Sequence, residues 1–567
     1  MNPELNILGI NCFSHDTSAA LLKGGQLVAF AEEERFTRQK HSRQFPYLAI
    51  EYCLQEGDLD INDIQCVAFP FIPSEDLKRG FNDFRRHPST ALRFGGQLNF
   101  DYQLNKKVRM FKKHYRYKGE VVHVGHHDAH IGSSFFGSPF KEAALLSIDR
   151  GGDYISTLLA QGKDNKILTI KEINNPHSLG SFYSCITNFL GFKPNGGEGK
   201  VMGLAPYGRP TCYHAFKKMV KLEEGGGFKI DLSYFTYHLK GGYGVSPKFM
   251  ELFGPPRVSE APITVRDEDI AWAVQKVTED VAVHLANYLY EKTGLTNLCL
   301  AGGLALNGVM NHVIKKNTPF KEIFIQPAAN DGGTSIGAAY CVWHGLLDNR
   351  REHLFTPSLA GFAHPYLGPS FNTEQIEQTL SHFDFKVAQL KSPAKKAAEL
   401  LKKGKIIGWF QGRMEGGPRA LGNRSILANP TISDMKEQLN SRVKFREGFR
   451  PFAPAVLEEE AAGFFDEFYP SPFMLTVLPI KKEKRHLLPA VCHVDNTGRL
   501  QTVSRALNPL FYELISEFYK LSGVPVVLNT SFNVRGEPIV ASVEDALHCF
   551  TGTNLDALII GNYLVEK

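Results

Sequence analysis

The sequence of 567 residues lacks several features that would assign it to a special class of protein. It has no run of roughly 18 or more apolar residues, so no membrane-spanning helix is expected. Its first residues, MNPELNILGINCF, contain no basic segment followed by a long apolar one, so a signal peptide is not expected either. The nine cysteines are scattered without a CxxC pair. This pattern predicts reduced thiols in a cytoplasmic protein and disfavours a disulfide framework or a zinc ribbon.

A large excess of charge of one sign is also missing. The 64 basic and 59 acidic residues leave a formal net charge of +5. An excess this small predicts neither a nucleic-acid nor a membrane partner, but it suits anionic phosphate ligands. The composition, 43% hydrophobic and 22% charged, is typical of a globular protein. Since domains commonly hold about 100–200 residues, two or more are expected.

A strand pattern occurs twice in the first third of the chain. In each copy, a buried apolar strand leads through a polar loop with an acidic residue to a second strand, a tight turn and a third strand. The predicted strands are 5–11, 17–22 and 26–33 in the first copy, and 143–148, 154–160 and 167–173 in the second. This repeat predicts a duplicated α/β domain. By fold analogy, two such halves are typical of the actin-like, ribonuclease H-like ATP-binding superfamily.

A Pro- and Gly-rich segment separates the two predicted domains. Apolar residues recur at helical spacing over 270–292, and a further strand and helix are predicted at 298–300 and 308–315. The segment TPSLAGFAHPYLGPS, residues 356–370, then reads as a linker. The sequence therefore predicts a first domain over 1–355 and a second over 371–567.

Two histidines and two aspartates form a candidate metal site. His126 and His130 are spaced i, i+4, which places both rings on one face of a helix. Asp149 ends a predicted strand, and Asp331 follows another, 322–326. Loops at strand ends form ligand sites in α/β proteins, and this donor set suits Fe(II), Mn(II) or Zn(II). The alternative is that the histidines only cap or pack.

Three further elements have both a functional and a structural interpretation. The Gly-rich turns 196–200 and 301–307 could let backbone N–H groups approach a phosphate or ribose, or could simply be tight turns. Neither is a Walker A loop. His15, in the first polar loop, is a candidate general base or a hydrogen-bonded histidine.

Basic residues gather at the start of the predicted second domain. They are Arg413, Arg419, Arg424, Lys444, Arg446 and Arg450. The stretch 413–424 carries many turn residues and a single Glu, whereas a solvated helix face would mix acids among the bases. Guanidinium groups in rigid loops suit phosphates and carboxylates, so we favour an anion pocket over a solvated face. Ser531 and Asn533, after the predicted strand 524–528, could hold phosphate oxygens.

Taken together, these segments resemble the O-carbamoyltransferase family of nodulation and antibiotic biosynthesis. The matching stretches run in order along nearly the whole chain, and GRMEGGPRALGNRSILA is the most specific of them. The others are SHDTSAALL, AEEERFTRQKH, HHDAH, GGEGKVMGLAPYG, AGGLALN, NDGGTSIGAA, FRPFAPAV, HVDNTGRLQTV and LNTSFNVRGEPIV.

The resemblance implies a two-site enzyme. The C-terminal domain would have a YrdC-like α+β fold and make carbamoyl adenylate from carbamoyl phosphate and ATP with Mg²⁺. The N-terminal domain would resemble threonylcarbamoyl transferases, bind the adenylate on a metal, usually Fe(II), and pass the carbamoyl group to a hydroxyl of a small molecule. Natural product biosynthesis is the expected context.

The resemblance also assigns roles to single residues. His126, His130, Asp149 and Asp331 match the metal ligands, and His15 matches the base. Carbamoyl phosphate and ATP are assigned to Arg413, Arg419, Lys444, Arg450 and Ser531. The adenylate in the N-terminal domain is assigned to Lys40, Gly197, Gly302, Gly303 and Asn307. One departure is Arg150, where the family more often has glycine, which leaves the shape of the loop after Asp149 open.

Other functions remain alternatives at this point. They are a threonylcarbamoyl-type transferase that modifies tRNA, an actin-like kinase, and an actin- or chaperone-like ATP-dependent binding protein. The acceptor is not identified, but its contacts are expected from two segments interpreted as variable loops, 72–115 and 225–256. The oligomeric state is open, with a homodimer as one alternative.

Overall fold

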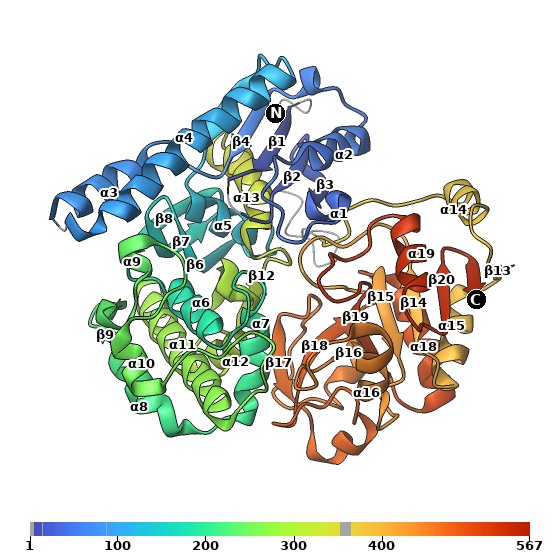
Figure 1. Cartoon of the computed structure of the whole chain (residues 1–567). Coiled ribbons are helices and arrows are strands. Elements are labelled where there is room, and N and C mark those ends of the chain that lie inside the picture. The colour runs from blue at the N-terminus through green and yellow to red at the C-terminus, as the bar shows by residue number, and fades with distance from the viewer. Residues whose placement is uncertain (1–4, 14, 87, 352–363) are drawn as a thin grey trace. The chain divides into compact units, whose positions relative to one another are not determined.

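The computed structural model describes residues 5–13, 15–86, 88–351 and 364–567 and divides the chain into two compact units (Figure 1). The first unit holds Met1–Phe30 and Arg43–Phe355, and the second holds Ala31–Ser42 and Thr356–Lys567. Most of the predicted linker, 356–363, lies outside the described residues. No helix in the described part of the chain is both long and apolar enough to cross a membrane.

The first sheet of unit 1 has five strands in the order β3-β2-β1-β4-β5. β1 pairs antiparallel with β2 and parallel with β4, and β4 pairs parallel with β5. Every residue of β1 is buried, as its continuous apolar run predicts. The strands are β1 (Asn6–Asn11), β2 (Ser18–Lys23), β3 (Gln26–Glu32), β4 (Cys66–Phe69) and β5 (Glu120–His123).

The second sheet repeats this arrangement, with the order β8-β7-β6-β11-β12. β6 pairs antiparallel with β7 and parallel with β11, and β11 pairs parallel with β12. The strands are β6 (Glu142–Gly152), β7 (Ile155–Lys163), β8 (Lys166–Asn174), β11 (Asn297–Ala301) and β12 (Glu322–Ile325). The predicted duplication and the α/β class are therefore confirmed, whereas the actin-like assignment stays a prediction.

Helix α13 (Thr334–Tyr340) packs closely against both α5 (His126–Phe135) and β1. A Cβ atom on Gly337 would lie 1.7 Å from the carbonyl oxygen of Ala129, and one on Gly9 would lie 1.9 Å from that of Ser335. Glycine is therefore required at both contacts. The close packing brings the start of α13 next to α5.

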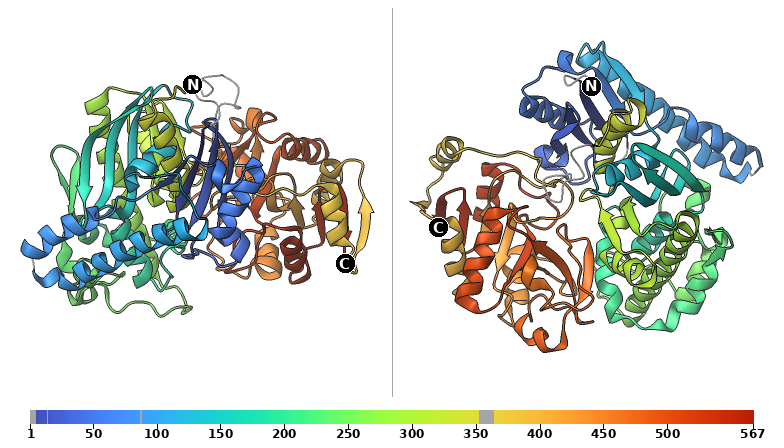
Figure 2. Two further views of the ribbon diagram at one scale, coloured as in Figure 1. Left: turned by 90° about the horizontal axis from the view of Figure 1, so that it is seen from above. Right: turned by 180° about the vertical axis from the view of Figure 1, so that it is seen from behind.

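The segments 72–115 and 225–256 are not loops, so that interpretation was wrong. The first contains two helices, α3 (Glu75–Arg86) and α4 (Ala91–His114), which pack against each other (Figures 1 and 2). The second contains β10 (Gly227–Ile230), α9 (Tyr237–Lys240) and α10 (Pro247–Phe253). The predicted helices near 270–292 and 308–315 are present as α11 (Val265–Thr293) and α12 (Gly308–Asn317).

Unit 2 is built on a nine-stranded mixed sheet with the order β13-β21-β20-β14-β15-β19-β16-β18-β17. Alternate residues serve opposite faces: in β14, Trp409 packs with Phe511 and Phe518 of α18, whereas Phe410 belongs to the core on the other face. The strands are β13 (Lys386–Gln389), β14 (Ile407–Phe410), β15 (Arg424–Ala428), β16 (Ala453–Leu457), β17 (Thr476–Pro479), β18 (Thr497–Val503), β19 (Val526–Ser531), β20 (Ala557–Ile560) and β21 (Tyr563–Glu566). The main helices are α14 (Thr373–Leu380), α15 (Pro393–Lys402), α18 (Pro509–Ser522) and α19 (Val543–Thr551). The YrdC-like assignment stays a prediction.

Candidate functional site

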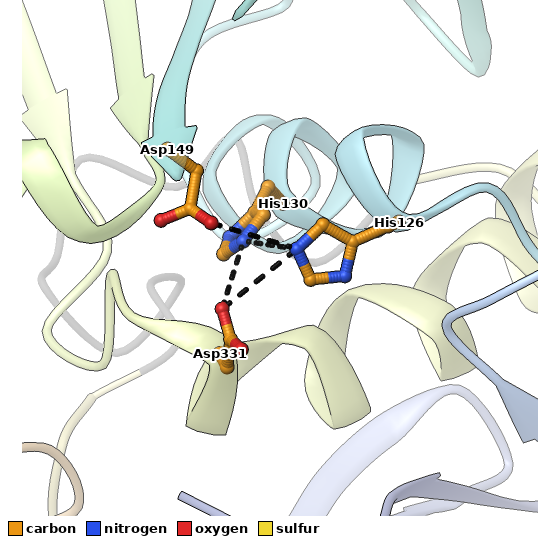
Figure 3. A group of neighbouring side chains, drawn as sticks. All are labelled: His126, His130, Asp149 and Asp331. Carbon is orange, nitrogen blue, oxygen red and sulfur yellow. Dashed lines mark hydrogen bonds and ion pairs between the residues drawn. The ribbon is translucent and has the colours of Figure 1, made fainter. Parts of the chain in front are cut away.

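The four predicted metal ligands converge in unit 1 (Figure 3). His126 and His130 lie one turn apart on α5, Asp149 lies in β6, and Asp331 begins the short helix η7 (Asp331–Gly333). All four side chains are buried, and their ligand atoms lie within 4.8 Å of one another. β6, β11 and β12 run parallel, so the chain segments that follow them meet at one edge of the sheet.

The spacing of the donor atoms suits one ion. The two Nε2 atoms are 3.2 Å apart, and Oδ1 of Asp331 lies 3.7 Å from Nε2 of His126 and 3.6 Å from Nε2 of His130. Oδ2 of Asp149 lies 3.8 Å from Nε2 of His126. A tetrahedral ion with ligand bonds of about 2.1 Å has ligand–ligand edges of about 3.4 Å. The residues present therefore fit a divalent metal.

The charges of neighbouring side chains shift the pKa values of His126 and Asp149. Burial by itself would lower the pKa of His126, but the carboxylates of Asp149 and Asp331 raise it to about 9. Burial alone would raise the pKa of Asp149, but His126 and His130 hold it well below its usual value. The carboxylates are thus kept ionised, as metal ligands must be.

Residues around the ligands fix their positions. The backbone N–H of His126 donates to Oδ2 of Asp153 at 2.7 Å, which holds the start of α5. Asn11 donates to the carbonyl oxygen of Asp331 at 3.0 Å. Neither Asp153 nor Asn11 was predicted as a site residue, although Asp153 lies within one of the two polar loops of the repeat and Asn11 lies beside the other. Arg150, which stands where the family more often has glycine, donates to the hydroxyl of Tyr243 at 2.6 Å. Asp149 nevertheless lies in the cluster of four predicted ligands.

His15 lies in the loop that joins β1 and β2, and its ring is oriented by Asp16. Nδ1 of His15 is 2.9 Å from Oδ2 of Asp16, and the same oxygen accepts from Nδ2 of Asn330 at 2.8 Å. Burial alone would lower the pKa of His15, but the hydrogen bond to Asp16 and the charges of Asp331, Asp16 and Asp149 raise it to about 9. Its neighbour Ser14 lies outside the described residues.

The Gly-rich turns have structural roles in unit 1. Gly302 has φ +87, and a Cβ there would lie 2.3 Å from the carbonyl oxygen of Ile148. Asn307 caps α12, because its Oδ1 accepts from the N–H of Met310 at 3.0 Å. Gly197 immediately precedes the helix α7 (Glu198–Leu204). Adenylate binding by Gly197, Gly302, Gly303 and Asn307 stays a prediction.

Lys40 does not lie in the N-terminal unit, so its predicted placement was wrong. It belongs to the segment Ala31–Ser42, which is part of unit 2. Within that unit, Arg35 donates to the carbonyl oxygen of Gly417 at 2.7 Å, and Arg38 donates to that of Ile539 at 2.7 Å. The segment begins at the end of β3, a strand of the first sheet. Nothing in the sequence pattern predicts that it belongs to unit 2.

A group of basic side chains lies together in unit 2. Burial lowers the pKa of Arg419 to about 10 with help from the charge of Arg450, and lowers that of Arg446 to about 9 with help from the same residue. Burial and the charges of Arg419, Arg446 and Arg450 hold the pKa of Arg499 well below its usual value. Arg499 was not predicted as a site residue, although it lies in the family-like stretch HVDNTGRLQTV.

Lys444 and Ser531 lie beside each other in unit 2. Nζ of Lys444 donates to the carbonyl oxygen of Ser531, and to the carbonyl oxygen and Oδ1 of Asn533, both at 2.9 Å. The hydroxyl of Ser531 donates to the same Oδ1 at 2.8 Å. Burial is the main cause that lowers the pKa of Lys444, and the charges of Arg446, Arg450 and Lys40 add to it.

Two of the predicted arginines have structural partners. Arg413 donates to the carbonyl oxygen of Leu367 at 2.7 Å. Arg424 is fully buried, lies 3.7 Å from the ring centre of Phe410, and donates to backbone carbonyls, among them that of Gln411 at 2.6 Å. The one Glu of the loop, Glu415, accepts from three backbone N–H groups, those of 421, 423 and 424. Anion binding by Arg413 stays a prediction.

Comparisons of both parts of the chain with known proteins point to the same family. A model described as "Carbamoyltransferase N-terminus" matches residues 6–340, and one described as "Carbamoyltransferase C-terminus" matches residues 398–567. The Synechocystis protein named Uncharacterized protein sll1178 is 41% identical over 608 aligned residues, which cover 99% of this chain and 97% of that protein. Nodulation protein NolNO of Sinorhizobium fredii is 38% identical and covers 98% and 80%, and Nodulation protein U of the same species is 36% identical and covers 96% of each.

Solved structures are more distant. Full-length HypF in its phosphate- and nucleotide-bound form is 13% identical to this chain, with a TM-score of 0.33 over 61% of this chain and 56% of that one. A similarity at this level supports no conclusion about fold.

Proposed function

Because the chain belongs to the carbamoyltransferase family, we propose that it is an ATP-dependent O-carbamoyltransferase with two chemical sites. Unit 2 would convert carbamoyl phosphate and ATP into carbamoyl adenylate, and unit 1 would transfer the carbamoyl group to a hydroxyl of a small-molecule acceptor. The observation that carries the proposal is the division of charge: unit 1 has a buried cluster of imidazoles and carboxylates, and unit 2 has a cluster of basic side chains. The cluster in unit 1 suits a cation, and the cluster in unit 2 suits an anion.

In unit 2, the basic side chains would bind the anionic substrates. Burial is the main cause that lowers the pKa values of Arg419, Arg450 and Arg499, and repulsion from neighbouring arginine charges lowers them further. Phosphate groups placed among them would relieve this repulsion and accept charge-assisted hydrogen bonds. Water would first hydrolyse carbamoyl phosphate to carbamate and phosphate. The carbamate oxygen would then form a bond to the α-phosphorus of ATP as the bond to pyrophosphate breaks. An enclosed site protects carbamate, which decomposes in water.

In unit 1, His126, His130, Asp149 and Asp331 would hold the metal, with Fe(II) as the predicted ion. When bound, a divalent cation supplies positive charge that polarises a carbonyl or phosphate oxygen. His15 would accept the proton of the acceptor hydroxyl at Nε2, because Asp16 engages Nδ1. The hydroxyl oxygen would bond to the carbamoyl carbon, and AMP would leave with the electrons of the broken C–O bond.

The decisive experiment is isotope exchange between pyrophosphate and ATP with the whole protein. We expect exchange that depends on carbamoyl phosphate, because adenylate formation is reversible and needs both substrates. A kinase would instead release ADP, and a tRNA-modifying transferase would need RNA for product formation. Exchange without carbamoyl phosphate, or none with it, would overturn the proposal.

A further inference from the structure

The helices α3 and α4 form an arm along one edge of unit 1 (Figures 1 and 2). Residues 75–114 contain ten Lys and Arg against four Asp and Glu, a local net charge of +6, whereas the whole chain carries +5. The charges of the remaining residues therefore nearly balance, and the positive excess belongs to this arm. The small excess of the whole chain, from which no membrane partner was expected, conceals this uneven distribution.

The inner face of α4 packs within unit 1. Leu104 and Phe111, two turns apart, are buried, and the ring centre of Phe111 lies 6.1 Å from that of Phe69 in β4. Nζ of Lys107 donates to the carbonyl oxygen of Cys12, in the loop that joins β1 and β2. These contacts attach α4 to the first sheet and account for one face of the helix only.

The opposite face of α4 carries an exposed stripe without a carboxylate. Most exposed positions between 92 and 113 recur every three or four residues, which places them on one side of the helix. Leu92 is 74% exposed and Tyr102 is 57% exposed. Apolar residues dominate the first half of the stripe and basic residues the second. Its members are Leu92, Gly95, Gly96, Leu98, Asn99, Tyr102, Lys106, Arg109, Met110 and Lys113.

The carboxylates of the arm, by contrast, are only partly exposed, and each has a partner. Two form ion pairs, Glu75 with Arg79 at 2.8 Å and Asp83 with Arg93 at 3.4 Å. The other two accept backbone N–H groups. Within the part of the chain that the structure describes, the exposed basic side chains of the arm form no ion pair. They are Lys78, Arg85, Lys106, Arg109, Lys112 and Lys113.

Exposed apolar side chains are also concentrated in the arm. Among the described residues, eighteen large apolar side chains are exposed, and five of them lie within 81–110. Single exposed apolar residues are normal, but a group of them marks an interaction surface. The five are Phe81, Leu92, Leu98, Tyr102 and Met110. The arm therefore exposes apolar and basic side chains together.

This combination discriminates among partners. Two copies of the chain that met through their arms would bring like charges together, which disfavours self-association. A nucleic acid would neutralise the basic side chains but offers no apolar environment to the exposed leucines. An anionic membrane matches both features. Its phosphate groups attract Lys and Arg, and apolar side chains enter the boundary between head groups and acyl chains.

We propose that the exposed surface of α3 and α4 docks unit 1 on an anionic phospholipid membrane. α4 has 24 residues, about 36 Å, and lies in the plane of the head groups. Leu92, Leu98 and Tyr102 enter the boundary with the acyl chains, while Lys106 and Lys113 contact lipid phosphates. The binding is peripheral, so no helix crosses the bilayer. This inference does not depend on the proposed function.

The test is flotation of the whole protein with lipid vesicles. The probes are vesicles of phosphatidylcholine alone and of an equimolar mixture of phosphatidylcholine and phosphatidylglycerol. We expect the mixed vesicles to bind at least about tenfold more tightly than phosphatidylcholine alone, because only they attract the basic side chains. Binding should weaken as salt is added, because salt screens this attraction.

The charge of the arm is tested with Lys106→Glu plus Lys113→Glu. This double variant should weaken binding to the mixed vesicles at least about tenfold. Lys218→Glu plus Lys221→Glu is the control, because it changes the net charge equally at exposed positions of unit 1 outside the arm. The control should bind nearly as the parent does.

The apolar contribution is tested with Leu92→Ser plus Leu98→Ser, which should weaken binding about tenfold or more. Leu252→Ser plus Val258→Ser makes equivalent changes at exposed positions elsewhere in unit 1 and should have little effect. All of these positions are exposed, so each variant should unfold at the same temperature as the parent. Thermal unfolding of every variant checks this.

The inference is overturned if the mixed vesicles do not bind, if both kinds of vesicle bind alike, or if the arm variants behave as their controls do. An RNA oligonucleotide that binds more tightly than the vesicles, and is lost in Lys106→Glu plus Lys113→Glu, would assign the surface to nucleic acid instead. A dimer in sedimentation that Leu92→Ser plus Leu98→Ser dissociates would assign it to a second copy of the chain. Pyrophosphate exchange without membrane binding refutes this inference alone, and membrane binding without exchange refutes only the proposed function.

Discussion

The backbone N–H of Gly303 donates a 2.7 Å hydrogen bond to Oδ1 of Asp149, while Oδ2 of that carboxylate lies 3.8 Å from Nε2 of His126. The turn at 301–307, which the sequence pattern suggested as a phosphate-binding loop, thus orients a predicted metal ligand. Partners of this kind fix the direction of a carboxylate and tune its affinity for a metal. Glycine at 302 allows the turn to adopt this conformation. The backbone has a φ of +87 there, and the carbonyl oxygen of Ile148 lies too close for a side chain.

We therefore predict that Gly302→Ala weakens metal binding about ten- to a hundredfold, as changes next to metal ligands commonly do. The added Cβ would lie 2.3 Å from the carbonyl oxygen of Ile148, so the loop must move and Asp149 loses its orienting hydrogen bond. Metal content after dialysis and the dissociation constant for Fe(II) or Zn(II) are the measurements. Gly199→Ala is the control, because a Cβ at that position meets no atom within 4 Å. Equal metal affinity in the two variants would refute the orienting role.

The double variant His126→Ala plus His130→Ala should abolish carbamoyl transfer and leave pyrophosphate release intact. Both residues lie in unit 1, whereas the basic cluster predicted to bind carbamoyl phosphate lies in unit 2. Release of pyrophosphate and product formation are measured separately, the second with chemically supplied carbamoyl adenylate. His214→Ala removes an exposed histidine of the same unit and should change neither. A double variant that transfers normally but releases no pyrophosphate would reverse the assignment of the two steps.

Lys444→Met should weaken binding of inorganic phosphate and block pyrophosphate release. Losing one charge-assisted contact costs about 1.5–3 kcal/mol, which is about ten- to a hundredfold or slightly more. Arg442→Ala removes a nearby charge that pairs with Asp556 at 3.0 Å, and it should have little effect. Unchanged pyrophosphate release in Lys444→Met would refute the anion-binding role.

The same residue should give phosphate binding a pH dependence. Burial depresses the pKa of the Lys444 amine, so the free protein loses this positive charge as the pH rises through that lowered value. An anion favours the protonated amine, so binding takes up a proton and weakens toward alkaline pH. Calorimetric titrations with inorganic phosphate at a series of pH values measure this slope. It should be shallower in Lys444→Met, and an equal slope would exclude Lys444 as its source.

His15→Asn should slow transfer about 10²–10⁴-fold, the usual range for general base catalysis, and spare pyrophosphate release. Without metal, the pKa of His15 is about 9, because nearby carboxylates outweigh burial. The base must be neutral to accept a proton, so transfer should rise with pH through the pKa of His15. A cation bound by Asp149 and Asp331 opposes their charge and should lower that pKa toward neutrality.

NMR titration of His15 before and after Zn(II) addition measures this change, and Asp16→Asn provides a comparison because Asp16 also raises the pKa. A pH profile of transfer that keeps its acidic limb in His15→Asn would show that the base lies elsewhere. If His15→Asn instead weakens only adenylate binding, His15 is a binding residue.

Some of the molecule followed from local pattern. The strands of both repeats were predicted within a few residues, because apolar runs and tight turns act over short distances. The placement of His126 and His130 on one helix face follows from the helical period alone. By contrast, residues 72–115 form helices rather than loops, because α3 and α4 are stabilised by packing on each other, which single-sequence periodicity did not reveal.

The sequence by itself determined the duplicated strand pattern, the spacing of the two histidines and the excess of arginine near the GRMEGGPRALGNRS stretch. Only the tertiary structure decided that Asp149 and Asp331 meet the histidines, that Arg499 joins Arg419, and that Lys40 belongs to unit 2. The reason is physical. Helical and strand periodicity is set by neighbouring residues. The pairing of β11 with β6 and β12, and the packing of Ala31–Ser42 in unit 2, depend on contacts between residues far apart in the chain.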